Sequence, residues 1–205
     1  MKKNIKDLII TVGFIIIGVA LFSYIGYTIY KDFFTKKQEN IVLKNLELYG
    51  YTLQESDTDV YKQEFDNLSK ILNKKEIDFE EYAKSMCKLY IIDFYTLTNK
   101  ISNTDIGGLE FIYPEYVSNF KLKAKDTLYK YVEVNYNGER TQALPEVSEV
   151  LINSVTNSKY KIGEEEFDSY ELDVSWNYKE DLGYQKSSKL TIIKDGNKLY
   201  LVEGS

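Results

Sequence analysis

The sequence predicts an α+β protein in which a single N-terminal transmembrane helix precedes a domain of helices packed on an antiparallel sheet. Three observations support this fold class. An uncharged apolar run covers residues 8–30, apolar residues recur at helical spacing between residues 58 and 132, and the last third of the chain alternates as strands do. Because the helices come before the strands, we expect an α+β domain with its helices on one face of the sheet.

The apolar run over residues 8–30 carries no charged side chain and lies between Asp7 and Lys31. As a helix it would extend about 34 Å, which exceeds the roughly 30 Å thickness of a hydrocarbon core. The run is also longer than the apolar region of a cleaved signal peptide. We therefore expect a retained signal anchor that contacts the lipid bilayer through residues 8–30.

Flanking lysines bear on the orientation of this anchor. Residues 1–7 carry three lysines and residues 31–37 carry three more, so the positive-inside rule is balanced. The free amino terminus favours a cytoplasmic N-terminus over residues 1–7. The expected protein is a single-pass bacterial cell-membrane protein with a stalk over residues 31–56 and an extracellular domain over residues 57–205.

Three helices are expected in the domain, each with apolar side chains at helical spacing on one face. Ser56 or Thr58 can cap the first helix, and Asp78 can cap the second. Gly107 and Gly108 mark a turn between the second helix and the third. The expected ranges of the three helices are 58–72, 78–101 and 114–132.

Four strands are expected after the helices. Residues 147–155 are rich in β-branched and apolar side chains, and residues 170–178 alternate strictly between apolar and polar side chains. Such alternation is typical of an antiparallel strand with one buried face. The other two strands are expected over residues 184–193 and 198–203, with a tight turn at residues 195–197 between them.

Composition argues against several kinds of site. The chain has no histidine and a single cysteine, Cys87, which removes His-containing triads, His-based metal sites and any intramolecular disulfide. The formal net charge of −6 argues against nucleic acid as a partner, because binding its phosphates requires clustered cations. Acidic groups such as residues 164–166 lack the spacing of a calcium-binding loop. We expect no metal, no cofactor and no nucleic-acid partner.

The order of elements resembles that of the nuclear-transport-factor-2-like (cystatin-like) superfamily. The resemblance covers about residues 57–205 and implies a strongly curved sheet wrapped by helices, with a cone-shaped cavity between the two layers. Together with an N-terminal span, it also resembles scaffold components of type IV secretion and conjugation machines, which implies protein partners in the cell envelope. The segments that carry the resemblance are DFEEYAKSMCKLYIIDFYTLTNKI, LYKYVE and SSKLTIIKDGNKLYLVEG.

Asp93 is the candidate site residue, because it interrupts the apolar face of its helix close to Met86 and Leu97. We expect its carboxylate to be desolvated, which raises the pKa of a carboxyl group. One interpretation is a ligand site in a cavity lined by Tyr90, Asp93 and Leu97. The other, which we favour, is a structural carboxylate bonded to a tyrosine hydroxyl, a lysine or backbone amides.

These observations predict a membrane-tethered extracytoplasmic domain that acts in protein interaction or scaffolding and is not an enzyme. The motivation is the apolar run, the compact domain and the lack of a catalytic constellation. Two alternatives stay open: a small-molecule binding domain, and an isomerase- or dehydratase-like enzyme, each using a cavity near Asp93. The enzyme needs a second polar group that faces Asp93 in that cavity.

Overall fold

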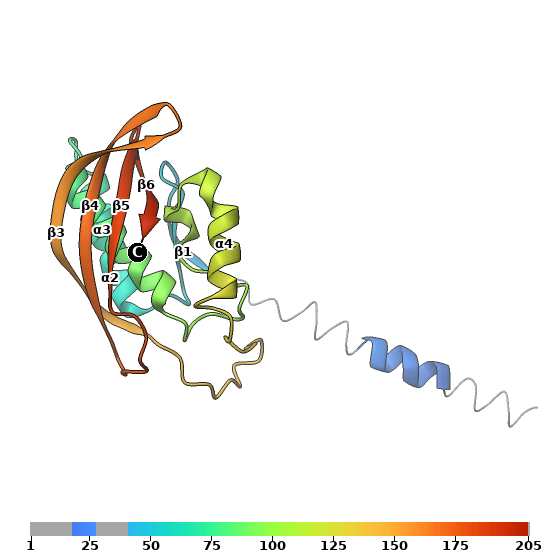
Figure 1. Cartoon of the computed structure of the whole chain (residues 1–205). Helices are drawn as coiled ribbons and strands as arrows, with labels where there is room; N and C mark the ends of the chain where they lie inside the picture. The colour runs from blue at the N-terminus through green and yellow to red at the C-terminus, as the bar shows by residue number, and fades with distance from the viewer. Residues whose placement is uncertain (1–17, 28–40, 205) are drawn as a thin grey trace, which may run out of the picture. The chain divides into compact units, whose positions relative to one another are not determined.

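The computed structural model describes residues 18–27 and 41–204 (Figure 1). The chain divides into two compact units, Met1–Glu39 and Asn40–Ser205. The candidate site residues all lie in the second unit.

The described part of the first unit is a helix over residues 18–27. Among the described residues, no helix is long and apolar enough to cross a membrane. This finding contradicts the predicted transmembrane helix over residues 8–30, and with it the signal anchor, the bilayer contact and the single-pass cell-membrane localisation with an extracellular domain. The rest of that run and the predicted cytoplasmic segment, residues 1–7, lie outside the described residues.

The second unit begins with a β-hairpin where the sequence predicted a stalk over residues 31–56. Strands β1 (Val42–Leu46) and β2 (Tyr51–Gln54) pair antiparallel. Tyr51 and Leu53 of β2 are buried in the core, because alternate side chains of a strand point to the same face. The described part of the predicted stalk therefore belongs to the folded domain.

Two helices follow the hairpin, and both begin where the sequence predicted. Helix α2 (Asp59–Leu72) starts after Thr58, whose hydroxyl oxygen accepts a 3.3 Å hydrogen bond from the Tyr61 amide. Helix α3 (Phe79–Tyr95) starts after Asp78, whose carboxylate accepts hydrogen bonds from two amides of the first turn. Each cap satisfies amides that have no partner inside the helix.

Helix α3 ends at Tyr95, earlier than its apolar pattern predicted. The Leu97 amide donates to the Pro145 carbonyl at 2.9 Å, instead of to the carbonyl four residues before it as in a helix. The hydroxyl oxygen of Thr96 accepts a 3.1 Å hydrogen bond from the Val147 amide. Residues 96 and 97 therefore form hydrogen bonds with the chain at the start of β3, and the helix does not continue through them.

The segment between α3 and the sheet contains only short helical elements. Two 3-10 turns, η1 (Leu109–Phe111) and η2 (Pro114–Tyr116), lead into helix α4 (Val117–Asp126). Helix α4 is shorter than the helix predicted over residues 114–132, because Thr127 leaves the helical region with φ −119° and ψ −99°.

The remaining strands form one four-stranded antiparallel sheet in the order β3-β4-β5-β6. The helices pack against this sheet, so the predicted α+β class with helices on an antiparallel sheet is confirmed. Figure 1 shows the long strands bending along their length beside α2 and α3. The bounds are β3 (Val147–Ile162), β4 (Glu165–Tyr178), β5 (Ser187–Asp195) and β6 (Lys198–Gly204).

Residues 112 and 113 join the segment before α4 to the edge of this sheet. Ile112 forms a parallel bridge with Leu201 of β6, and the Tyr113 amide donates to the Leu201 carbonyl at 2.9 Å. Figure 1 shows α4 beyond β6, on the side away from β3. Helix α4 is thereby placed next to β6.

Candidate functional site

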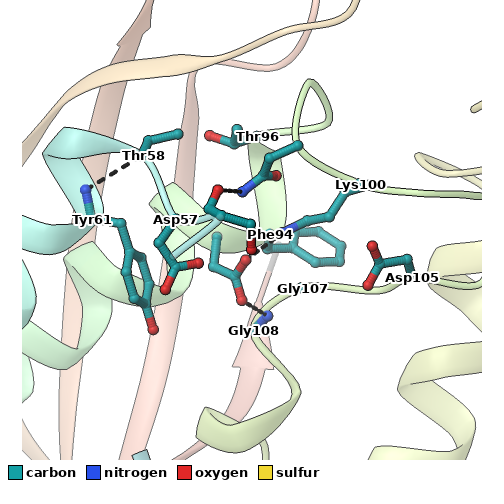
Figure 2. A network of polar contacts seen from close by, with 12 residues as sticks. Asp57, Thr58, Tyr61, Phe94, Thr96, Lys100, Asp105, Gly107 and Gly108 are labelled. Carbon is teal, nitrogen blue, oxygen red and sulfur yellow. Dashed lines mark hydrogen bonds and ion pairs between the residues drawn. The ribbon is translucent and has the colours of Figure 1, made fainter. Parts of the chain in front are cut away.

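Asp93 lies near the end of α3, and both of its carboxylate oxygens have protein partners. Lys100 Nζ forms an ion pair with Asp93 Oδ1, and the Gly108 amide donates to Asp93 Oδ2 at 2.6 Å. The side chains of Lys100 and Asp93 are only 7% and 20% exposed. Figure 2 labels Lys100 and Gly108, the two partners of this carboxylate, together with the nearby Asp57. These are the lysine and backbone partners that the structural interpretation of Asp93 requires.

The two glycines of the loop after α3 are required by close approach. A Cβ atom at Gly107 would lie 2.3 Å from the Asp93 carbonyl oxygen, a distance that no side chain tolerates. Gly108 has a φ of +74°, and a Cβ there would lie 2.8 Å from the Tyr90 ring. Glycine alone adopts such a φ without cost and leaves this space free. The glycine pair therefore lets the loop lie directly against α3.

Tyr129 also links the end of α3 to the glycine loop. Its hydroxyl donates to the Phe94 carbonyl at 2.7 Å and accepts a hydrogen bond from the Gly107 amide at 3.1 Å. Tyr129 is completely buried, and burial raises the pKa of its phenol well above the usual value. The hydroxyl therefore stays protonated and acts as a fixed bridge between the helix end and the loop.

Two further carboxylates lie in this region. Glu110 accepts hydrogen bonds from the Thr52 amide at 3.2 Å, the Thr52 hydroxyl at 3.3 Å and the Tyr61 hydroxyl at 3.2 Å. Burial raises the pKa of Glu110 to about 7, and the negative charge of Asp93 adds to this effect. Burial also raises the pKa of Asp57, whose carboxylate accepts a 2.7 Å hydrogen bond from the Gln54 amide. Glu110 thus joins η1 to β2 and α2.

The space next to Asp93 is closed. The small void lined by Asp57, Tyr61 and Asp93 has no volume left for a water-sized molecule. Within the described part of the chain, no group of three or more Asp, Glu, Cys or His side chains could hold a metal ion. A general base must reach the proton that it removes, and the Asp93 oxygens face protein donors instead.

A different part of the domain is open. A cavity of about 440 Å³ lies between α3, α4, β5 and β6. Of the three residues predicted to line a ligand site, Tyr90 lines this cavity, whereas Asp93 and Leu97 are not among its lining residues. Leu97 is completely buried in the core. The structure therefore separates Tyr90 from the other two predicted residues.

One wall of the cavity is aromatic. The Tyr90 and Phe94 rings stack with centroids 5.4 Å apart, and Phe120 of α4 lies 5.1 Å from Phe94 and 6.3 Å from Tyr90. The opposite wall, formed by β5 and β6, contributes Leu190 and Leu201. The cavity is therefore a slot between rings and aliphatic side chains.

Polar side chains also line this slot, among them Asn119, Gln185 and Ser188. The hydroxyls of Tyr90 and Tyr95 form no hydrogen bond with the described residues. Burial raises the pKa of Tyr90 well above its usual value and that of Tyr95 to about 12. Both phenols therefore keep their protons at neutral pH, and each can donate a hydrogen bond to a bound molecule.

Sequence reasoning missed Glu110 and the cavity rim. Glu110 stands in an otherwise apolar stretch directly after Gly107 and Gly108, which is a signal for a buried carboxylate beside a tight loop. Lys123 of α4 and Glu203 of β6 line the cavity, but they are 80 residues apart in sequence. No local pattern brings two such distant positions together.

Comparisons with protein-family models, with curated proteins and with solved structures found no match for this chain. The resemblance to the nuclear-transport-factor-2-like superfamily and to secretion scaffolds therefore stays a prediction. The fold and the cavity define an α+β domain with an open slot that has one aromatic wall.

The Glu110→Gln variant should change the pH dependence of stability. Because the folded state raises the pKa of Glu110 from 4.5 to about 7, the folded protein binds this proton more tightly than the unfolded chain. The stability that Glu110 contributes is complete below about pH 4.5 and is lost as the pH rises towards 7. The free energy of unfolding of wild type should therefore fall between pH 5 and pH 8 by about 1–3 kcal/mol more than that of Glu110→Gln.

Urea denaturation at pH 5 and pH 8 measures this difference. The exposed Glu115→Gln variant is the charge-matched control, since it also removes one carboxylate. An equal pH dependence for Glu110→Gln and wild type would contradict the assignment of a buried titrating group.

The Asp93→Asn and Lys100→Met variants should each destabilise the fold strongly. Either change leaves the other charge buried without its partner, which costs about 3–5 kcal/mol. The double variant should recover part of this loss, because no unpaired charge remains. Urea denaturation of the two single variants and the double variant measures the coupling between the two charges.

The exposed pair Lys44–Asp66 provides the control for this cycle, since its side chains are 40% and 61% exposed. Its coupling should not exceed about 1 kcal/mol. Additive effects of Asp93→Asn and Lys100→Met would show that the buried pair does not act as a unit.

Proposed function

We propose that the folded unit over residues 41–204 is a non-enzymatic binding domain that takes a small molecule into the slot between α3, α4, β5 and β6. The observation that carries the proposal is the cavity of about 440 Å³ in this slot. Ligand sites in proteins typically have volumes of about 300–1,000 Å³, with apolar walls and few polar groups.

The walls of the slot explain how a ligand would gain affinity. Rings of Tyr90, Phe94 and Phe120 face the aliphatic side chains of Leu190 and Leu201. An apolar group that enters is removed from water on both sides, which contributes about 25 cal/mol for each Å² of apolar surface buried. The two tyrosine hydroxyls can then orient a ligand that carries one hydrogen-bond acceptor.

The site lacks what the enzymatic alternative requires. An isomerase or dehydratase needs an accessible carboxylate with a second polar group facing it. Lys100 does face Asp93, but both lie in the closed network and not at the slot. This separation favours binding over catalysis as the function of the slot.

Protein interaction is the second candidate function, and the exposed edge of β1 favours it. Ile41, Val42 and Leu43 are 57%, 54% and 53% exposed, although all three are large apolar residues. Within residues 41–204, β1 pairs only with β2. An apolar strand with one unpaired edge can bind an extended segment of another protein by adding it to the sheet.

The cavity is tested by a fragment panel and by a variant that fills the slot. Wild type should bind at least one apolar fragment, detected by ligand-observed NMR and by a rise in melting temperature. A fragment present at 100 times its Kd stabilises the folded state by about 2.7 kcal/mol. Ala124→Trp places an indole at a buried position that lines the slot, so it should abolish this binding.

Leu122→Trp is the matched control, because it adds the same group at an exposed position of α4. Binding should survive in this variant. A fragment whose binding is weakened equally by both variants does not bind in the slot. If no fragment binds wild type, the proposed function is contradicted.

The β1 edge is tested by Val42→Lys, which places a charge on an exposed strand position without removing a core contact. Photo-crosslinking from Leu43 in the wild-type chain, in the cell that makes it, should capture a partner protein. The same crosslink should disappear in the Val42→Lys background. Identical crosslinked products in both backgrounds would contradict pairing at this edge.

A further inference from the structure

Helix α4 and the residues at its two ends border the slot with one face. Their slot-lining residues are three or four positions apart: Tyr116, Asn119, Phe120, Lys123, Ala124 and Thr127. Because an α-helix turns by about 100° per residue, these positions share one side of it. Lys123 lies near the middle of this side, whereas Lys121 and Lys125 lie outside it. Lys123 is therefore the lysine of α4 that lies on the side of the slot.

Glu203 of β6 also borders the slot, but its carboxylate belongs to the opposite face of the sheet. Glu203 pairs with Thr191 of β5, and both residues line a separate groove together with Lys189. Leu190 faces the slot, so the next side chain of β5, Thr191, points away from it. Lys123 forms no ion pair with another described residue. Within residues 18–27 and 41–204, the slot therefore faces one cation and no carboxylate.

The end of the slot that holds Lys123 is polar. The Tyr129 hydroxyl bonds to the Phe94 carbonyl at 2.7 Å, so the chain just after α4 lies beside the end of α3. The Tyr95 ring lies 4.4 Å from that of Trp176, whose amide donates to the Lys186 carbonyl at 2.9 Å. The end of α3 thereby also approaches the start of β5. The residues that line this end of the slot are Tyr95, Lys123, Thr127, Gln185 and Ser188.

The other end of the slot is mainly apolar. Ile112 forms a parallel bridge with Leu201 shortly before α4 begins, and both residues line the slot. The rings of Tyr90 and Phe120 lie 6.3 Å apart beside them. A ligand that matches both ends therefore has a negatively charged group at one end and an apolar body at the other.

We propose, as a specification of the binding function above, that the slot takes a carboxylate with an apolar body, such as an aryl- or alkyl-carboxylic acid. The carboxylate lies at the end that holds Lys123, where hydroxyl and amide groups can also donate hydrogen bonds to it. The body lies between Phe120 and the aliphatic side chains of Leu190 and Leu201.

Lys123 selects this class over molecules of other charge. An amine with the same body is repelled by the lysine, and a neutral amide keeps the burial of the body but loses the attraction. A phosphate monoester carries nearly two negative charges at neutral pH, which a single lysine does not balance. The apolar end therefore provides affinity for all of these molecules, and the charge provides the specificity.

Three compounds with one apolar body separate these contributions: 3-phenylpropionate, 3-phenylpropionamide and 3-phenylpropylamine. They are anionic, neutral and cationic at neutral pH. Isothermal titration calorimetry and ligand-observed NMR on the full chain give the Kd of each. The carboxylate should bind about 3-fold tighter than the amide, which is what one exposed ion pair contributes, and the amine should bind most weakly. High salt should remove the difference between the carboxylate and the amide.

Two variants of Lys123 test its role in the slot. Lys123→Gln should weaken binding of 3-phenylpropionate about 3-fold and leave the Kd of the amide unchanged. Lys123→Arg keeps the positive charge, so it should keep the preference for the carboxylate. Lys125→Gln is the matched control, because it removes a lysine of α4 that does not line the slot.

The outcomes distinguish this inference from the function on which it rests. The carboxylate is the wrong class, while the binding function stands, if the amide binds as tightly as the carboxylate or if the amine binds tightest. The same conclusion follows if other apolar fragments bind and none of the three compounds does. A preference for the carboxylate that survives in Lys123→Gln also overturns the inference. If no fragment and none of the three compounds binds, both proposals are overturned.

Discussion

The ion pair between Asp93 and Lys100 fixes the course of the chain between α3 and α4. It holds the turn after α3 against the last turns of that helix, and the Gly108 amide adds a second contact to the same carboxylate. The single arginine of the chain stabilises this turn from outside, since Arg140 donates to the carbonyls of Leu97, Thr98 and Lys100. Because a buried charge without its partner is so costly, this part of the chain has one favourable arrangement. That arrangement determines where the following elements, η1, η2 and α4, begin.

The slot depends on that arrangement. Because Gly107 and Gly108 lie against α3, the chain that follows them passes close to β6. There the Tyr113 amide donates a hydrogen bond to the Leu201 carbonyl. Helix α4 begins shortly after this contact and contributes a single buried residue, Ala124. A helix that buries so little cannot fill the space between α3 and the sheet, and the space that it leaves is the cavity. The ion pair thus contributes to the shape of the slot through the backbone, although neither of its residues lines the slot.

The sequence predicted the parts of this fold that depend on local interactions. The caps Thr58 and Asp78 act within one turn, so both helix starts were predicted correctly, and the alternation of residues 170–178 identified β4. The end of α3 was missed, because its terminating bonds come from Pro145 and Val147, about fifty residues further along the chain. The hairpin of β1 and β2 was missed because its apolar residues mix two periods. The predicted span over residues 8–30 was wrong for a different reason: its apolar length was used as sufficient proof of a helix that crosses a bilayer.

The same distinction explains why only part of the site could be predicted. That a carboxylate on an apolar helix face needs a lysine or amide partner follows from the cost of burying a bare charge, and Asp93 has both. Which lysine and which amide depends on how the glycine loop folds back, which a helical pattern does not contain. Lys123 and Glu203 have still less signal, since charged side chains are mostly exposed in any folded protein. Both residues line one cavity only because the fold places α4 and β6 on either side of it.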